Sequence, residues 1–262
     1  MKKLLCLFLL VLIFTSQAFA DNVAIDSTNF PDDAFRNYVR NFDTDSDDVL
    51  SAAEINAVET INVKHTYFMD PTIRTLAGIE YFTSLKYLDC VNNPIRSLDL
   101  SPFTNLELLE FGENHFTELN LSGHPNLRKV CYYGDTHYGN NNYYEEGGQP
   151  YRGEWYLKKL NLSSCPELKE VYIFYSFDIE EVNLSSCTSL RDAYVWADNI
   201  NLNGCTNLGT INFGGKNLTA IDLSSCTELY DIGCFGTRLT SLDLSSNTEL
   251  NYLSCYYNSQ LT

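Results

Sequence analysis

The sequence predicts an α/β solenoid, in which stacked coils with short parallel strands follow a small helical segment. Two observations support this fold class. First, a unit of about 21 residues recurs from Leu85 to the end of the chain, with the same order of apolar and turn residues. Second, residues 21–60 lack this unit and show the apolar spacing of two short helices around an acidic loop. Both patterns indicate a repeat array behind a helical N-terminal segment.

Residues 1–20 have the layout of a secretory signal peptide. Lys2 and Lys3 precede an apolar run over residues 4–14, and the small-residue sequence Ala18-Phe19-Ala20 follows it. We therefore expect an exported protein that is cleaved before Asp21. The apolar run is shorter than the roughly 20 residues that span a bilayer, and no later stretch approaches that length. No integral membrane span is expected.

Residues 21–60 are predicted to form a helical segment, and residues 61–84 a transition to the array. Pro31 is assigned to the first turn of one helix, since proline is favoured there. Ser51 and Glu54 have the spacing of a capping box at the start of a second helix. The apolar residues of the first helix fall on one face: Phe35, Tyr38, Val39 and Phe42.

The acidic loop between these helices, Asp43 to Glu54, has the ligand spacing of an EF-hand calcium loop. The candidate ligands, with a backbone carbonyl at the seventh position, are Asp43, Asp45, Asp47, Val49, Ser51 and Glu54. The sixth position, normally glycine, is Asp48, and aspartate tolerates a left-handed conformation better than most residues. Two interpretations stay open: a structural calcium ion, or a helix cap beside a solvated acidic turn.

Each repeat unit predicts one coil with two short extended segments. The unit from Leu229 shows apolar residues in two alternating runs: Leu229, Ile232 and Cys234, then Leu239, Leu242 and Leu244. The units begin at Leu85, Leu106, Leu127, Leu168, Leu190, Leu208, Leu229 and Leu250. A single coil cannot bury its apolar face, whereas stacked neighbours can. Since each buried Leu, Ile, Val or Phe contributes roughly 1.5–3 kcal/mol, residues 85–262 are expected to form a stable stack.

Units such as "LKYLDCVNNPIRSLDLSPFTN" resemble bacterial leucine-rich repeats of a short nested type. The resemblance covers residues 85–262 and implies parallel strands that follow one another along the array. The asparagine that this family places after the strand is present as Asn93, Asn114 and Asn217 and is absent from several units. A continuous asparagine ladder is therefore in question.

The segment "NFPDDAFRNYVRNFDTDSDDVLSAAEINAVETINV", followed by "IRTLAGIEYFTSLKYLDC", is similar to the helical cap that opens internalin-type leucine-rich repeat proteins. This resemblance implies an EF-hand-like cap that covers the exposed core of the first coil and need not bind metal. A single loop differs from calcium sensors and from dockerins, which carry two.

Cysteines recur at two positions of the unit. At the first position, three residues before the first leucine of the next unit, stand Cys165, Cys187, Cys205 and Cys226, and other units have Phe103, His124 and Asn247 there. At the second position, five residues after the first leucine of the unit, stand Cys90, Cys234 and Cys255, and other units have Phe, Tyr, Ile or Val there. Such positions are packing sites, so we expect buried free thiols. Disulfides are the alternative, because exported cysteines often pair. Metal ligation is not expected, since no close Cys or Cys/His cluster occurs.

The unit from Leu127 is nearly double length. Its extra residues, about 133–155, are rich in Tyr, Asn and Gly and show no periodicity. They predict a loop at one edge of the array, with a degenerate repeat as the alternative. Insertions in repeat arrays often lie on the binding face.

Aromatic residues occupy the outward positions of the first extended segment in several coils. The predicted ligand-binding residues are Tyr133, Tyr172, Phe174, Tyr175, Tyr194, Trp196, Phe235 and Tyr256. Strands of neighbouring coils lie about 4.8 Å apart, so we expect a contiguous aromatic patch. Exposed apolar patches mark contact surfaces, and Tyr and Trp are common anchors. Aromatic rows near carboxylates such as Glu170 and Asp192 also suit sugar rings. The alternative is that the rings pack against the insertion.

Charge and histidine placement weigh against two functional classes. The chain has 34 acidic and 17 basic residues and a net charge of −17, which opposes binding to nucleic acid. The histidines are scattered and show no catalytic or zinc-binding spacing: His65, His115, His124 and His137. An enzyme is not expected.

These patterns predict a secreted or bacterial cell-surface protein that binds a protein or glycan of a host or microbial surface through the aromatic patch and the insertion. The alternative is a structural spacer segment of a larger extracellular adhesin. The last unit stops in mid-coil without a polar cap, so we expect further chain or a partner at that edge. The sequence indicates no oligomeric state.

Overall fold

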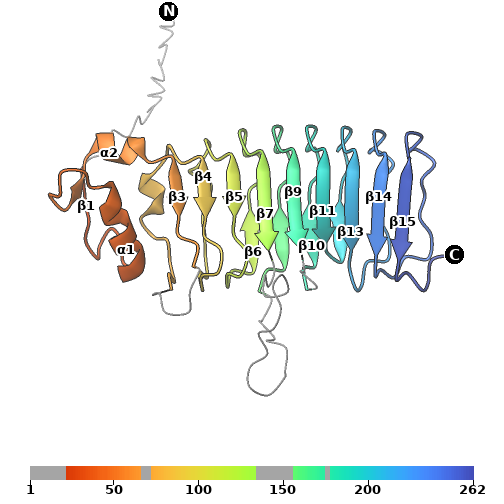
Figure 1. Cartoon of the computed structure of the whole chain (residues 1–262), viewed down its shortest axis with the longest axis horizontal. Coiled ribbons are helices and arrows are strands. Elements are labelled where there is room, and N and C mark those ends of the chain that lie inside the picture. Colours follow the sequence, from red (N-terminus) through yellow and green to blue (C-terminus); the bar gives the residue numbers. More distant parts are fainter. Residues whose placement is uncertain (1–21, 66–71, 134–155, 175–177) are drawn as a thin grey trace, which may run out of the picture.

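The computed structural model describes residues 22–65, 72–133, 156–174 and 178–262, with only the backbone of Tyr133. The predicted signal peptide, the insertion after Tyr133, His137 and Tyr175 lie outside these residues. The described chain is an elongated stack of coils, with helices at its N-terminal end and the last strand at the other (Figure 1). The predicted α/β solenoid is confirmed.

One side of the stack is a nine-stranded parallel sheet to which each coil contributes one strand. Its strands are β3 Thr60–Asn62, β4 Tyr87–Asp89, β5 Leu108–Glu110, β7 Lys129–Tyr133, β9 Glu170–Phe174, β11 Asp192–Trp196, β13 Thr210–Gly214, β14 Asp231–Phe235 and β15 Tyr252–Tyr256. The sheet begins at Thr60, one coil before the predicted first repeat at Leu85. The β-branched pair Thr60 and Ile61 favours a strand at this place.

The strands keep one register along the whole sheet. Val130 pairs with Val171 across the long unit, and Ala193 pairs with Ile211 across the short unit. Differences in unit length are therefore absorbed outside the strands. Because side chains alternate across a strand, this register separates one set of residues that faces the core from another that faces outward.

On the other side, four coils contribute short strands to a parallel sheet in the order β12-β10-β8-β6. Their bounds are β6 Glu118–Asn120, β8 Lys159–Asn161, β10 Glu181–Asn183 and β12 Asn199–Asn201. The predicted second extended segment is a strand in these coils, whereas residues 97–99, 220–222 and 241–243 form no strand. The last residue of each segment accepts a hydrogen bond from a nearby backbone N–H, as from Ser122 to Asn120 (3.1 Å) and from Ser101 to Asp99 (2.9 Å).

The core is a continuous column of apolar side chains through the stack. Leu88, Leu109, Val130, Val171 and Ile232 occupy the same position of their strands and are fully buried. At roughly 1.5–3 kcal/mol for each such side chain, the column is the main source of stability.

The cysteines before each unit start form a ladder of hydrogen bonds in addition to packing. Each thiol donates to the carbonyl oxygen of a leucine in the preceding coil, at Sγ···O distances of 3.1 Å for Cys165 to Leu121, 3.0 Å for Cys187 to Leu162 and 3.1 Å for Cys205 to Leu184. Burial raises the pKa of the Cys187 thiol to about 12. As expected, the cysteines of the described residues are free, and all except Cys255 are buried.

His124 and Asn247 continue this ladder at its two ends. The His124 ring places Nε2 3.0 Å from the Leu100 carbonyl oxygen and Nδ1 2.8 Å from that of Leu121. Asn247 donates to the carbonyl oxygens of Leu223 and Cys226. Cys, His and Asn can therefore replace one another at this position, because each carries a hydrogen-bond donor that reaches a carbonyl oxygen of the preceding coil.

The asparagines after the strands are only partly as predicted. Asn93 and Asn114 are buried and bond backbone groups of the turn, with Asn93 Nδ2 2.9 Å from the Val63 carbonyl oxygen. The assignment of Asn217 is wrong, because its exposed side chain bonds Asp198. Asn258 has this role in the last coil, donating to the Cys234 carbonyl oxygen at 2.9 Å. Asn217 lies one residue beyond the corresponding position of its unit.

The N-terminal segment contains α1 Asp33–Val39, the 3-10 helix η1 Arg40–Phe42 and α2 Ala52–Ala57, with a second 3-10 helix η2 Ile79–Tyr81 at the first turn. The two-residue strands β1 Val23–Ala24 and β2 Val49–Leu50 pair antiparallel beside the helices. The first-turn assignment of Pro31 is wrong, because the Asp32 carboxylate caps Ala34 N and Phe35 N at 3.0 Å and the helix begins at Asp33. The predicted capping box of Ser51 and Glu54 is present.

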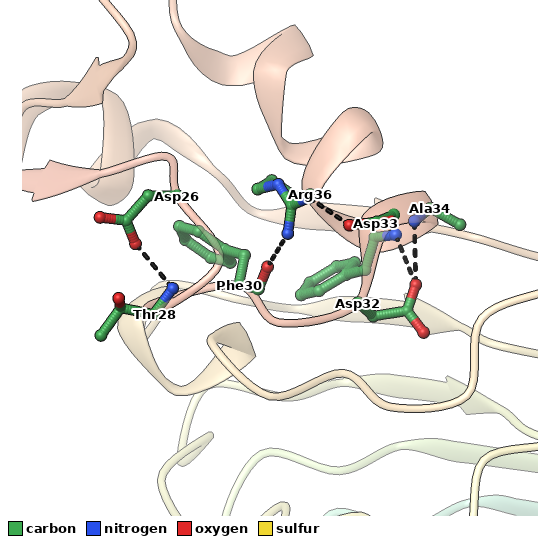
Figure 2. A network of polar contacts seen from close by, with 8 residues as sticks. Asp26, Thr28, Phe30, Asp32, Asp33, Ala34 and Arg36 are labelled. Atoms are coloured by element: carbon green, nitrogen blue, oxygen red, sulfur yellow. Dashed lines mark hydrogen bonds and ion pairs between the residues drawn. The ribbon is translucent and has the colours of Figure 1, made fainter.

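Figure 2 shows the polar contacts that connect the start of α1 to the loop before it. Arg36 forms an ion pair with Asp33 and donates to the Phe30 carbonyl oxygen at 2.7 Å. Phe30 is fully buried and packs edge-on against Phe35 and Tyr81. The second oxygen of Asp32 accepts from Arg74 N at 2.8 Å, which links the helix to the first coil.

Candidate functional site

The outward positions of β9 and β11 carry four aromatic rings that contact one another. The strand register pairs Tyr172 with Tyr194, and each strand carries a further ring two residues on, Phe174 and Trp196. Their centroids are 5.4 Å apart for Tyr172 and Tyr194, 5.5 Å for Phe174 and Tyr194, and 6.2 Å for Phe174 and Trp196. All four side chains are partly exposed. We call this group, Tyr172, Phe174, Tyr194 and Trp196, the aromatic surface.

The predicted single patch is interrupted at β13. Asn212 and Gly214 occupy the outward positions there, so no ring joins Trp196 to Phe235 among the described residues. Phe235 stacks with Tyr256 at 6.3 Å between centroids, and this pair forms a second, smaller group. The expectation of one contiguous patch is therefore wrong for the C-terminal residues.

Two other predicted binding residues lie outside what the structure describes. Tyr175 follows β9, and the side chain of Tyr133 belongs to the strand that pairs with β9. Tyr257, in the turn after β15, is 91 % exposed and has a positive φ of 59°.

Charged groups lie at the N-terminal edge of the aromatic surface. Lys129 on β7 forms an ion pair with Glu170 at 2.8 Å, and its Nζ lies 4.9 Å from the centroid of the Tyr172 ring. The hydrogen bond to Glu170 raises the pKa of Lys129. Burial, followed by the charge of Glu170, raises the pKa of Tyr172. One ammonium group is thus already bound by a carboxylate and a ring of this sheet.

Farther toward the N-terminus the outward face is acidic. Asp89 on β4 is 3 % exposed and accepts hydrogen bonds from Val91 N (3.1 Å) and the Tyr87 hydroxyl (3.4 Å). Burial, with the nearby charge of Asp89, raises the pKa of Glu110 on β5. In the shared register, β4 and β5 therefore carry carboxylates at the position where β9 and β11 carry tyrosine rings.

The acidic loop brings three of the predicted metal ligands together. Asp43, Asp45 and Asp47 each offer a carboxylate oxygen within 4.8 Å of the others. Asp48 at the sixth position has φ of 63°, the left-handed conformation that the loop requires. Repulsion from Asp47 is the largest cause of a raised pKa at Asp45. These three carboxylates fit a divalent cation.

The remaining predicted ligands are used in other contacts. Glu54 accepts hydrogen bonds from Thr44 N and its hydroxyl at 2.6 Å through one oxygen, and from Ser51 N and its hydroxyl through the other. The Thr44 hydroxyl is the largest cause of the lowering of the Glu54 pKa to about 2. Val49 lies in β2, opposite Ala24. A cation in this loop would therefore compete with Thr44 and Ser51 for Glu54.

The described histidines lie in three different places. His65 follows β3, His115 packs on Tyr156 with ring centroids 4.2 Å apart, and His124 belongs to the cysteine ladder.

The helices in the described part of the chain are all too short or too polar to span a bilayer.

No family model and no curated protein matches this sequence. Among solved structures, the chain is similar to the functional domain of InlJ from Listeria monocytogenes, which is described as including a cysteine ladder, at 16 % identity and a TM-score of 0.36. That match covers 92 % of this chain and 63 % of the InlJ chain, less than two thirds of its length.

Two further internalins from the same organism are similar in fold. Internalin C2 matches at 18 % identity and a TM-score of 0.48, over 90 % of this chain and 98 % of that one. InlF matches at 17 % identity and a TM-score of 0.35, over 90 % and 85 %. These matches are similarities only, and the fold assignment rests on the strand register described above.

Proposed function

We propose that this protein is a secreted or cell-surface recognition protein that binds a protein or glycan ligand through the aromatic surface. The observation that carries the proposal is the contact of four partly exposed rings on two adjacent strands. Tyr and Trp offer a large contact area and lose little conformational entropy on binding. A rigid group of this kind is typical of binding surfaces.

The scaffold supports this role because it holds the rings before any ligand arrives. Val171 and Ala193, which alternate with the rings on β9 and β11, are fully buried in the core. Preorganisation of this kind reduces the entropy lost on binding. In the sequence the insertion follows β7, the strand that pairs with β9, and we propose that it takes part in ligand binding as well.

Alanine substitution tests the proposal on the mature chain. Tyr194→Ala and Trp196→Ala, separately and together, are screened against arrays of glycans and of short random-sequence peptides. We expect loss of ligands that wild type retains. Tyr257→Ala is the matched control, because it removes an exposed ring outside the aromatic surface. Retention of every ligand by the double variant would favour the spacer function instead.

For the acidic loop, we propose a structural calcium ion held by Asp43, Asp45 and Asp47. The support is the spacing of their carboxylate oxygens and the left-handed Asp48. Such an ion would stiffen the N-terminal segment rather than take part in recognition.

A further inference from the structure

The outward face of the sheet shows how it binds a cation. Lys129 Nζ lies 2.8 Å from a Glu170 oxygen and 4.9 Å above the Tyr172 ring. The carboxylate and the ring stand two residues apart on β9, so both reach the same ammonium group from one strand. Glu170 and Tyr172 together form a small binding site for a positive charge.

The next coil carries a carboxylate and a ring in the same arrangement. The register pairs Glu170 with Asp192 and Tyr172 with Tyr194, so β11 carries a carboxylate and a ring with the same spacing. Asp192 forms no ion pair with any residue that the structure describes. Thr210 and Asn212, its neighbours on β13, are neutral.

The charge of the whole face favours a cationic ligand. The strands of the nine-stranded sheet carry one basic residue, Lys129, and the acidic residues Asp89, Glu110, Glu170, Asp192 and Asp231. Lys129 is already paired with Glu170, which leaves Asp192 as the carboxylate of the two aromatic strands without an ion pair among the described residues. Complementary charge of this kind guides a partner to a surface and fixes its register.

Ring geometry favours a protein side chain over a sugar. Tyr172 and Phe174 are stacked, with centroids 5.8 Å apart and planes 16° from parallel. Each ring therefore covers part of the other's face, and less ring face is left for a flat sugar. A lysine or arginine side chain needs less area, and its aliphatic part packs against rings while its charge reaches a carboxylate.

We propose that Asp192 and Tyr194 form a subsite for a lysine or arginine side chain of a partner protein, with Trp196 packing on the adjacent residue of that partner. This inference rests on the proposed recognition function and names the chemistry of its ligand. The partner segment is an exposed stretch of a basic protein, with an apolar or aromatic residue next to the cation.

The test uses the mature chain and an array of short random-sequence peptides, with a second array in which acetyl-lysine and citrulline replace lysine and arginine. We expect selected peptides to be enriched in Lys and Arg and to lose binding on the neutral array. Asp192→Asn is expected to weaken binding about tenfold, with less effect at high salt. Glu181→Gln on β10 is the matched control, because it removes a carboxylate from the opposite sheet.

The other possible results of these tests distinguish failure of the subsite from failure of the recognition function. Peptides that bind without cation enrichment, or glycans alone, and that are lost with Trp196→Ala but not with Asp192→Asn would overturn the subsite and leave the recognition function standing. Binding that survives the double substitution of Tyr194 and Trp196 by alanine, or no binding on either kind of array, would contradict both.

Discussion

The indole of Trp196 lies against Gly214 on the neighbouring strand. A Cβ at Gly214 would stand 2.7 Å from the indole Nε1 and 2.6 Å from the carbonyl oxygen of Phe235. The missing side chain at Gly214 therefore sets how Trp196 is placed in the aromatic surface.

Gly214→Ala is accordingly expected to displace the indole and weaken binding of any ligand of the aromatic surface, with a loss of stability of about 1–3 kcal/mol because the new Cβ also meets the backbone of Phe235. The change is measured as a shift in tryptophan fluorescence together with ligand affinity. Gly236→Ala is the control, since nothing lies within 4 Å of a Cβ there, although its positive φ adds some strain. Unchanged fluorescence and affinity in Gly214→Ala would contradict the contact.

The cysteine ladder predicts a difference between two small substitutions. Cys187→Ala removes both the thiol volume and the donor to the Leu162 carbonyl oxygen, and should lower the free energy of unfolding by about 1–2 kcal/mol. Cys187→Ser keeps a donor and should lose less. Denaturant unfolding of both variants measures this. A serine variant that is less stable than the alanine variant would show that the position needs only an apolar side chain.

The lowered pKa of Glu54 predicts a pH dependence of stability. Because the pKa is about 2 in the folded protein and about 4.3 in an unfolded chain, ionised Glu54 stabilises the fold at neutral pH. This contribution is lost as the pH falls through that interval. Glu54→Gln should melt at a lower temperature than wild type at pH 7, and the gap should close between about pH 4 and pH 2. A gap that stays constant with pH would refute the assignment.

A calcium ion in the acidic loop predicts a rise in melting temperature with added Ca²⁺. Asp45→Asn should abolish the rise, because Asp45 is one of three clustered carboxylates, and it is a cleaner choice than Asp43 and Asp47, which also accept backbone hydrogen bonds in the loop. Glu59→Gln, a carboxylate outside the loop that pairs with Lys86, is the control. A melting temperature that is insensitive to millimolar Ca²⁺, on the scale expected of weak sites, would reject the ion.

The stack could be predicted from the sequence because burial depends on a short repeated pattern. Leu229, Ile232 and Cys234 return at the same spacing in other coils, and the structure buries all three. The outward placement of Tyr172 and Tyr194 followed from the same alternation.

Competing interactions could not be predicted in this way. Ser51 and Glu54 fit both a calcium loop and a capping box by spacing, and only the contact with Thr44 shows that the Glu54 oxygens are already bonded. The break at β13 did have a signal, since Asn212 and Gly214 stand where other strands carry rings. The start of α1 was missed because the Asp32 cap displaced the proline preference.

The most direct test of the account is an NMR titration of the mature chain, with labelled aromatic side chains, against a peptide or glycan selected on the arrays. We expect the signals of Tyr172, Phe174, Tyr194 and Trp196 to shift together over the same range of ligand concentration, while that of Tyr257 stays unchanged. Shifts confined to rings outside the aromatic surface would contradict it.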